Sequence, residues 1–163
     1  MATKDSSPFD RHDHDHCASH VLDRAVALAS ERGVRLTPVR KRTLEILAES
    51  HRAMGAYDVL ERLAAEGFGN QPPVAYRALE FLEEQGLAHR IRRLNAFTAC
   101  MHPGETHSPA FLICESCHAV AEAPATEVLD ALGRAAKPLG FAIKHSHLEA
   151  TGLCHACETG AVA

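Results

Sequence analysis

Residues 72–100 have the sequence PPVAYRALEFLEEQGLAHRIRRLNAFTAC, in which a helical pattern changes to a strand pattern at Gly86. Two prolines open the helix. The residues expected to face the core recur at helical spacing: Ala75, Ala78, Leu79 and Leu82. Residues 87–93 and 96–100 predict the two strands of a hairpin that turns at Asn95 and exposes basic side chains. A helix followed by a basic hairpin predicts the winged form of helix-turn-helix.

Three more helices are predicted before this stretch: residues 21–33, 37–50 and 56–67. The second has the clearest start, because Thr37 can cap it and Pro38 suits the first helical position. Residues 1–18 are polar, rich in His and Asp, and aperiodic, so we expect a disordered tail. A solvated segment is the simpler interpretation of this tail, and an auxiliary zinc site is the alternative.

The C-terminal part follows a polar link and predicts a strand, a short strand, a helix and a long strand: residues 110–114, 119–122, 125–137 and 140–149. A unit this small needs help from a metal or a partner chain. The expected fold class is α+β, with an N-terminal winged helix and a small C-terminal α/β domain. The expected boundaries are a tail at 1–18, the winged helix at 19–101, a hinge at 102–109 and the second domain at 110–163.

Composition and charge limit the possible functions. The chain has a net charge of −4, but residues 21–100 hold 12 Lys/Arg against 10 Asp/Glu, and residues 101–163 hold 3 against 7. Only the first part can therefore meet phosphate. No run of apolar residues is long enough for a membrane span, and the N-terminus lacks an apolar signal core. We expect a cytoplasmic protein, in which cysteines favour metal binding over disulfides.

Two CxxC pairs, separated by 36 residues, supply four thiolates: Cys114, Cys117, Cys154 and Cys157. Four thiolates suit a tetrahedral structural zinc. The pairs lie at opposite ends of the C-terminal unit, so one ion would hold its last strand to its first. A redox thiol pair and an iron–sulfur centre are the alternatives.

A second set of potential ligands lies where the two units meet: His89, Cys100, His107 and Glu122. Nitrogen and sulfur ligands favour zinc over magnesium, calcium or manganese. Each residue also has an ordinary structural explanation, and His102 and His118 are rival ligands nearby. Spacing alone leaves this site open.

Three stretches resemble the ferric uptake regulator family: VRLTPVR at 34–40, AYDVL at 56–60 and PPVAYRALEFL at 72–82. The cysteine tetrad belongs to the same pattern, and the resemblance spans nearly the whole chain. Within the family, the second set matches the sensing ligands of the zinc-uptake branch, which includes a cysteine. The resemblance implies two zinc ions per protomer, a C-terminal dimerisation domain and a homodimer that binds palindromic operator DNA. It also implies a repressor of zinc-uptake genes, not an enzyme.

The fourth predicted helix is expected to enter the major groove of DNA. Tyr76 and Arg77 lie on its exposed face, where Arg77 suits bidentate contact with guanine. Tyr57 matches a family position that meets DNA. Phosphate contacts are expected from Arg35, Arg40, Arg92 and Arg93. For each basic residue, an ordinary solvated position is the alternative.

These features support an allosteric mechanism, in which zinc at the hinge selects one spacing between the recognition helices of a dimer. Three other readings stay open. One is a family member that senses a different metal. The others are a zinc enzyme, which would keep a ligand position open for water, and a zinc-containing adaptor that binds only protein.

Overall fold

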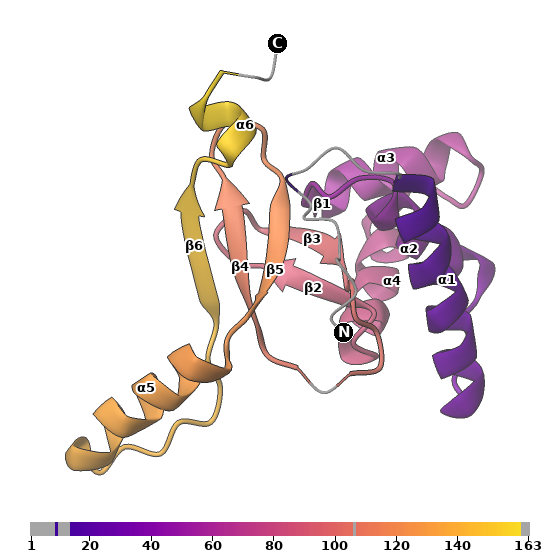
Figure 1. The fold of residues 1–163 in the computed structure, drawn as a ribbon. Coiled ribbons are helices and arrows are strands. Elements are labelled where there is room, and N and C mark those ends of the chain that lie inside the picture. Colours follow the sequence, from indigo (N-terminus) through magenta and orange to yellow (C-terminus); the bar gives the residue numbers. More distant parts are fainter. Residues whose placement is uncertain (1–8, 10–13, 106, 161–163) are drawn as a thin grey trace.

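The computed structural model describes residues 9, 14–105 and 107–160, which form two units (Figure 1). The N-terminal unit contains α1 (His14–Glu31), α2 (Pro38–Ala48), β1 (Met54–Gly55), α3 (Ala56–Ala65), α4 (Pro72–Glu84), β2 (Ala88–Ile91) and β3 (Ala96–Ala99). The C-terminal unit contains β4 (Pro109–Cys114), β5 (Val120–Pro124), α5 (Thr126–Ala136), the 3₁₀ turn η1 (Lys137–Leu139), β6 (Leu148–Gly152) and α6 (His155–Glu158). Within the described residues, no helix combines the length and apolar character needed to cross a membrane.

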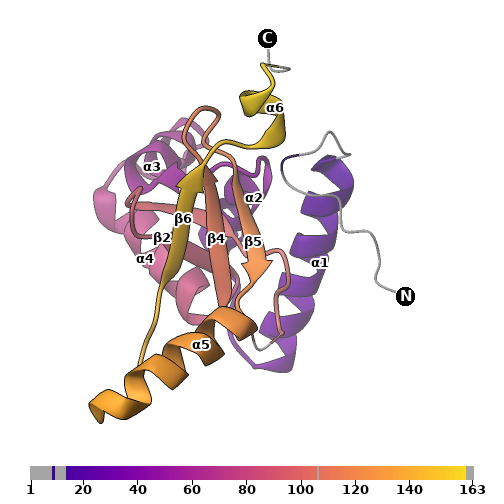
Figure 2. The same cartoon turned by 60° about the vertical axis from the view of Figure 1, so that its left-hand side comes forward.

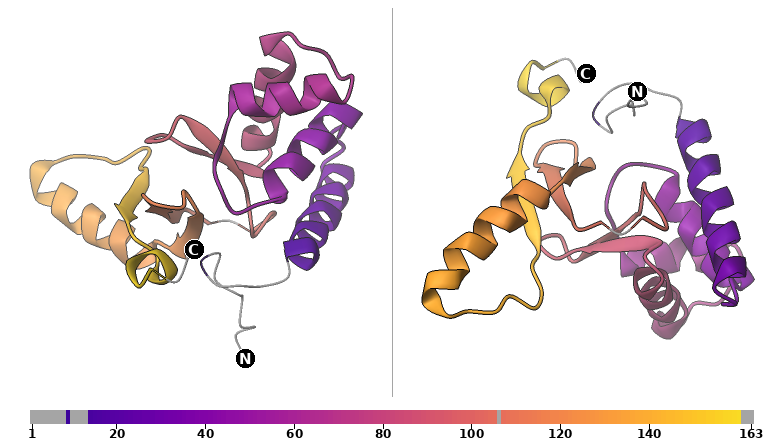
Figure 3. Two further views of the ribbon diagram at one scale, coloured as in Figure 1. Left: turned by 90° about the horizontal axis from the view of Figure 1, so that it is seen from above. Right: turned by 60° about the horizontal axis from the view of Figure 1, so that its bottom comes forward.

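Two small sheets organise these elements. The first has the order β1-β3-β2, and its β2–β3 hairpin is the predicted wing. The second has the order β5-β4-β6, with β4 antiparallel to β5 and parallel to β6. The wing lies between the helices and the second sheet, while α5 projects away from the rest (Figures 1 and 3). The expected winged-helix and α/β architecture is confirmed.

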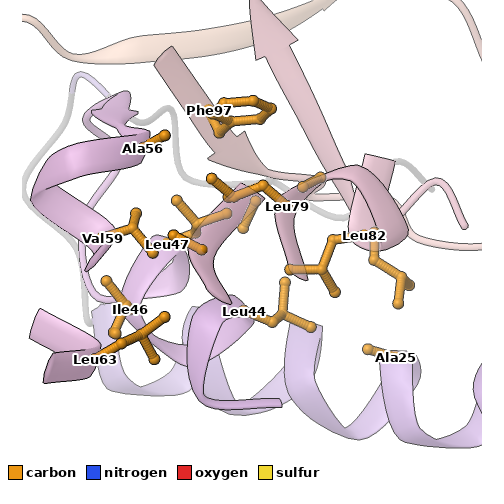
Figure 4. Close-up of a cluster of buried hydrophobic side chains, with 14 of the residues drawn as sticks. Ala25, Leu44, Ile46, Leu47, Ala56, Val59, Leu63, Leu79, Leu82 and Phe97 are labelled. Atoms are coloured by element: carbon orange, nitrogen blue, oxygen red, sulfur yellow. The ribbon is translucent and has the colours of Figure 1, made fainter. Parts of the chain in front are cut away.

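The core of the N-terminal unit fixes α4 against its neighbours. Leu44 and Leu47 of α2 and Leu79 and Leu82 of α4 are almost completely buried in one cluster, which Phe97 of the wing completes (Figure 4). Burying each leucine contributes about 1.5–3 kcal/mol. The opposite face of α4, which includes Tyr76 and Arg77, stays exposed. Thr37 also caps α2 as predicted, its hydroxyl accepting from the backbone N–H of Arg40 at 3.5 Å.

Two boundaries differ from the sequence prediction. α1 begins at His14, inside the stretch expected to be a tail, whereas residues 1–8 and 10–13 lie outside the described region. The long strand expected over 140–149 is wrong, because only Leu148–Gly152 pairs with β4. β4 is six residues long, so a longer partner strand would have no neighbour at its start. The chain instead turns at Gly140, whose φ is +64°.

The two units are in direct contact. Ile91 of the wing packs against Phe111, Ile113 and Val120 of the second sheet. The backbone N–H of Val120 donates to the carbonyl of His51 at 2.7 Å. The junction therefore has a packed apolar centre, and the wing is the part of the N-terminal unit that fills it.

Candidate metal centres and nucleic-acid interface

Four potential metal ligands meet at the junction of the units: His89 on β2, Cys100 after β3, His107 on the link and Glu122 on β5. One ligand atom of each lies within 4.8 Å of the others. His102 and His118, the rival ligands, lie outside this group. The fold thus brings the predicted residues of the second set together, and it does so across the boundary between the units.

Hydrogen bonds aim His107 and Glu122 into the group. The Nδ1 of His107 donates to the carbonyl of Glu105 at 2.9 Å, which leaves the Nε2 lone pair free to bind a cation. That Nε2 lies 3.2 Å from Glu122 Oε2 and 3.6 Å from Cys100 Sγ. The other Glu122 oxygen, Oε1, accepts from the backbone N–H of Met101 at 3.0 Å. The side chains are thus oriented by neighbours that are not themselves ligands.

His89 supplies the observation that best fits a metal. Its Nε2 is buried and is the one buried side-chain nitrogen or oxygen in the described residues that lacks a hydrogen-bond partner. Burial lowers the pKa of His89, so the ring is neutral at neutral pH. The ring packs 5.3 Å from that of Phe111, between centroids. A buried polar atom without a partner is destabilising, and a shared cation would satisfy it together with the other three donors.

Zinc binding at the junction is expected to release about one proton from Cys100 near neutral pH. Burial, followed by the charge of Glu122, raises the pKa of the Cys100 thiol to about 12, so the metal-free side chain is protonated. His89 is neutral and releases none. The zinc affinity of this site should therefore rise roughly tenfold per pH unit above about pH 7. Chelator competition over a pH series measures this pH dependence of the zinc affinity. An affinity that does not change with pH would contradict this account.

The cysteine tetrad forms a second cluster at the far end of the C-terminal sheet: Cys114, Cys117, Cys154 and Cys157, whose sulfurs all lie within 4.8 Å of one another. The sulfurs of Cys117 and Cys154 are 3.9 Å apart. Burial raises the pKa of Cys114, but backbone N–H groups of Cys117, Cys154 and Ser116 donate toward its sulfur and lower that pKa to about 6. The environment of Cys114 thus favours its thiolate, whereas burial raises the pKa of Cys117. The cluster lies where α6 meets the end of β4 (Figure 2).

Two of the residues predicted to meet DNA, Tyr57 and Tyr76, lie side by side on the exposed surface of the helical bundle. Tyr57 lies in the first turn of α3 and Tyr76 in the second turn of α4, and their rings form an edge-to-face pair at 6.4 Å. They are 67% and 40% exposed, which is unusual for large aromatic side chains. Arg77 is exposed beside them on the first turns of α4. The exposure of this aromatic pair is consistent with a partner-binding surface centred on α4.

Some of the basic residues predicted to contact phosphate are exposed, and one contacts neighbouring groups of the protein. Arg35, Arg92 and Arg93 are exposed. Arg40, for which the phosphate contact stays a prediction, stacks 3.6 Å from the ring centroid of Phe81 and donates to the carbonyl of Arg35 at 2.7 Å. The structure thus gives Arg40 a role in holding α2 against α4, a role that its sequence position did not reveal.

The sequence model of the ferric uptake regulator family matches residues 31–151. The chain belongs to this family. A curated member, the zinc uptake regulation protein of Escherichia coli, is 39% identical over 84% of this chain and 81% of its own length. A solved structure described as a zinc uptake regulator complexed with zinc and DNA is 37% identical, with a TM-score of 0.82 over 90% of this chain and 98% of that one.

A third relative has been solved in two states. The holo form of XcZur is 40% identical, with a TM-score of 0.76 over 87% of this chain and 99% of that one. Its apo form is 39% identical, with a TM-score of only 0.52 over 88% and 99%. Because the two forms are almost equally similar to this chain in sequence, the difference in TM-score reflects a difference in conformation between them. The arrangement of this member of the ferric uptake regulator family is closer to the holo form than to the apo form.

Proposed function

We propose that this protein is a zinc-responsive transcriptional repressor that binds operator DNA as a zinc-loaded homodimer and represses zinc-uptake genes. The observation that carries the proposal is the convergence of His89, Cys100, His107 and Glu122 at the junction of the DNA-binding and C-terminal units. The similarity to a zinc uptake regulation protein, and to a regulator solved with zinc and DNA, supports it.

Each protomer is proposed to hold two zinc ions. The cysteine tetrad would take a structural ion, because four thiolates close a tetrahedral site. The junction set would take the sensed ion, and its thiolate and imidazoles favour zinc over the hard divalent cations. An iron–sulfur centre or a redox pair at the tetrad, and another sensed metal at the junction, are less consistent with the relatives.

In the proposed switch, zinc binding restricts the motion of the two units relative to each other. His89 lies on the wing strand β2 and Cys100 directly follows the wing strand β3, whereas His107 belongs to the link and Glu122 to the C-terminal sheet. Zinc supplies a multivalent cation that these donors can share, and their convergence then fixes the wing against the sheet. In a dimer, this fixes the distance between the two α4 helices, and only one distance fits a palindromic operator. The holo-like arrangement is consistent with this mechanism.

The C-terminal unit is proposed to be the dimerisation domain. It exposes apolar side chains on α5 and on the segment after it: Val128, Leu132, Leu139 and Phe141. Phe141 is 67% exposed and Leu139 is 81% exposed, which is unfavourable in a monomer. The hinge expected at 102–109 is shortened to 102–108 because β4 begins at Pro109, the second domain follows it, and the winged helix is extended from 19–101 back to His14.

The competing classes are less consistent with this geometry. A hydrolytic zinc centre needs an open ligand position for water, whereas four convergent protein donors leave none. A protein-binding adaptor would not need an exposed aromatic pair beside Arg77 at the start of α4. Both alternatives predict that the protein captures no specific DNA.

Exchanging Arg77 and Arg40 for alanine is expected to impair DNA binding in two different ways. Arg77→Ala should lose about 1–3 kcal/mol of affinity and relax discrimination at one base pair, since bidentate contact with guanine is removed. Arg40→Ala should weaken binding to all sites without changing the salt dependence if, as its stacking on Phe81 supports, Arg40 acts by positioning α4. Affinities over a salt series separate the two, and a reduced salt slope for Arg40→Ala would assign it a phosphate contact.

Capture of genomic DNA fragments by the purified protein tests the proposed function. In zinc-buffered solution, the protein should retain a discrete palindromic site at high free zinc and release it at low free zinc. Capture that ignores zinc would remove the junction set as the switch. Capture of nothing at any zinc level would exclude the repressor and favour the enzyme or adaptor.

A further inference from the structure

The wing is attached to the C-terminal sheet at a second point, away from the junction ligands. Glu149 on β6 accepts from two successive backbone N–H groups in the turn of the wing. Its Oε1 accepts from Arg92 at 2.7 Å, and its Oε2 accepts from Arg93 at 2.9 Å. Both oxygens of one carboxylate are thus used, and both donors belong to the other unit of the molecule.

Glu149 and the junction ligand Glu122 lie in one row of side chains that runs across the strands of the C-terminal sheet. Phe111 on β4 is the register partner of Glu122 on β5 and also of Glu149 on β6. Register partners point to the same face of a sheet, so these three side chains share the face that meets the wing. Phe111, in the middle, contacts the ring of His89.

The spacing of this row matches the length of the wing strand. Neighbouring strands are about 4.8 Å apart, so Glu122 and Glu149 are about 10 Å apart along the row. From His89 to Arg92, three residues of extended chain also cover about 10 Å. Figures 1 and 2 show β2 running across the strands of this sheet, not along them. Each end of β2 therefore meets one carboxylate of the row.

We propose that Glu149 is a positioning residue for the metal switch, which holds the turn of the wing while the junction ligands hold its base. An attachment at one point leaves the wing free to rotate about that point, whereas two attachments fix its direction. The inference rests on the proposed function, because it deepens how the junction site controls the DNA-binding unit. Glu149 also stabilises the arrangement in which the four junction donors converge, so it raises the zinc affinity of a site that it does not contact.

The test compares Glu149→Gln with wild type in chelator competition for the junction zinc. Glutamine keeps the shape but has one acceptor oxygen, and its NH₂ faces an N–H donor. We expect roughly tenfold weaker zinc binding at the junction, the value for one charge-assisted hydrogen bond. The tetrad should keep its zinc.

Glu127→Gln on the exposed surface of α5 is the matched control: it removes the same charge and should leave the zinc affinity of the junction unchanged. Glu149→Asp, too short to reach both amides, should act in the same direction.

Hydrogen exchange at the amides of residues 92 and 93 provides the structural readout. In the zinc-loaded wild type these amides should be protected, and in Glu149→Gln they should exchange faster while the amides of α4 do not. Zinc affinity equal to wild type in both Glu149 variants would overturn the proposal, whatever the amides do. Neither readout uses DNA, so failure of the protein to bind any operator would refute the proposed function without deciding the role of Glu149.

Discussion

A Cys114→Ser protein is expected to lose the structural metal and the fold of its C-terminal unit together. Cys114 is almost fully buried at the end of β4, and its sulfur accepts the backbone N–H of Cys154 at 3.4 Å. A structural zinc contributes on the order of 10 kcal/mol of folding free energy, which is comparable to the entire net stability of a domain, about 5–15 kcal/mol. The small core around β4, β5 and β6 cannot replace that contribution.

Zinc content and thermal unfolding measure this effect. The variant should bind at least one zinc fewer per protomer and should show no cooperative unfolding of the C-terminal unit, while the winged helix keeps its helical signal. The matched control is Cys100→Ser, which removes a buried thiol outside the tetrad and should unfold cooperatively. A metal-free Cys114→Ser protein with a cooperative C-terminal transition would refute a structural role for the tetrad.

The second large effect is expected for Cys100→Ser, which should keep its fold and its structural zinc but lose zinc-dependent DNA binding. Serine has no thiolate to give the metal. Removing even an outer partner of a zinc ligand weakens binding 10- to 100-fold, so loss of a ligand should cost about 100-fold or more. The half-maximal zinc concentration for DNA binding, followed by fluorescence anisotropy, measures the shift. An unchanged zinc dependence would remove Cys100 from the sensing set.

Much of this molecule could be predicted from its sequence because the relevant signals are local. The helix starts at Thr37 and Pro72, the helical spacing of apolar residues and the turn at Asn95 each depend on near neighbours. The two CxxC pairs also predict a metal site directly, from their residue type and spacing. The four junction ligands could not be assigned from the sequence spacing alone, because that spacing does not distinguish His107 from His102. The fold separates them, since the carbonyl of Glu105 orients the ring of His107 toward the group.

What the sequence could not provide depends on contacts between distant residues. The start of β6 at Leu148 is set by the length of its partner β4, not by the residues from 140 to 147. The stacking of Arg40 on Phe81 joins two helices, and nothing in either segment indicates it. The bonds of Glu149 to the wing could not be predicted either, because they depend on the register of β6 against β4.

The central claim is that zinc at the junction fixes the two units in the arrangement that binds DNA. One zinc titration tests it, with small-angle X-ray scattering and DNA affinity measured on the same samples of protein whose tetrad is already loaded. The account predicts that the molecule becomes more compact over the same range of free zinc in which DNA binding appears, and that Cys100→Ser shows neither change. Full compaction before the junction zinc binds, or DNA binding at zinc levels that leave the scattering unchanged, would contradict it.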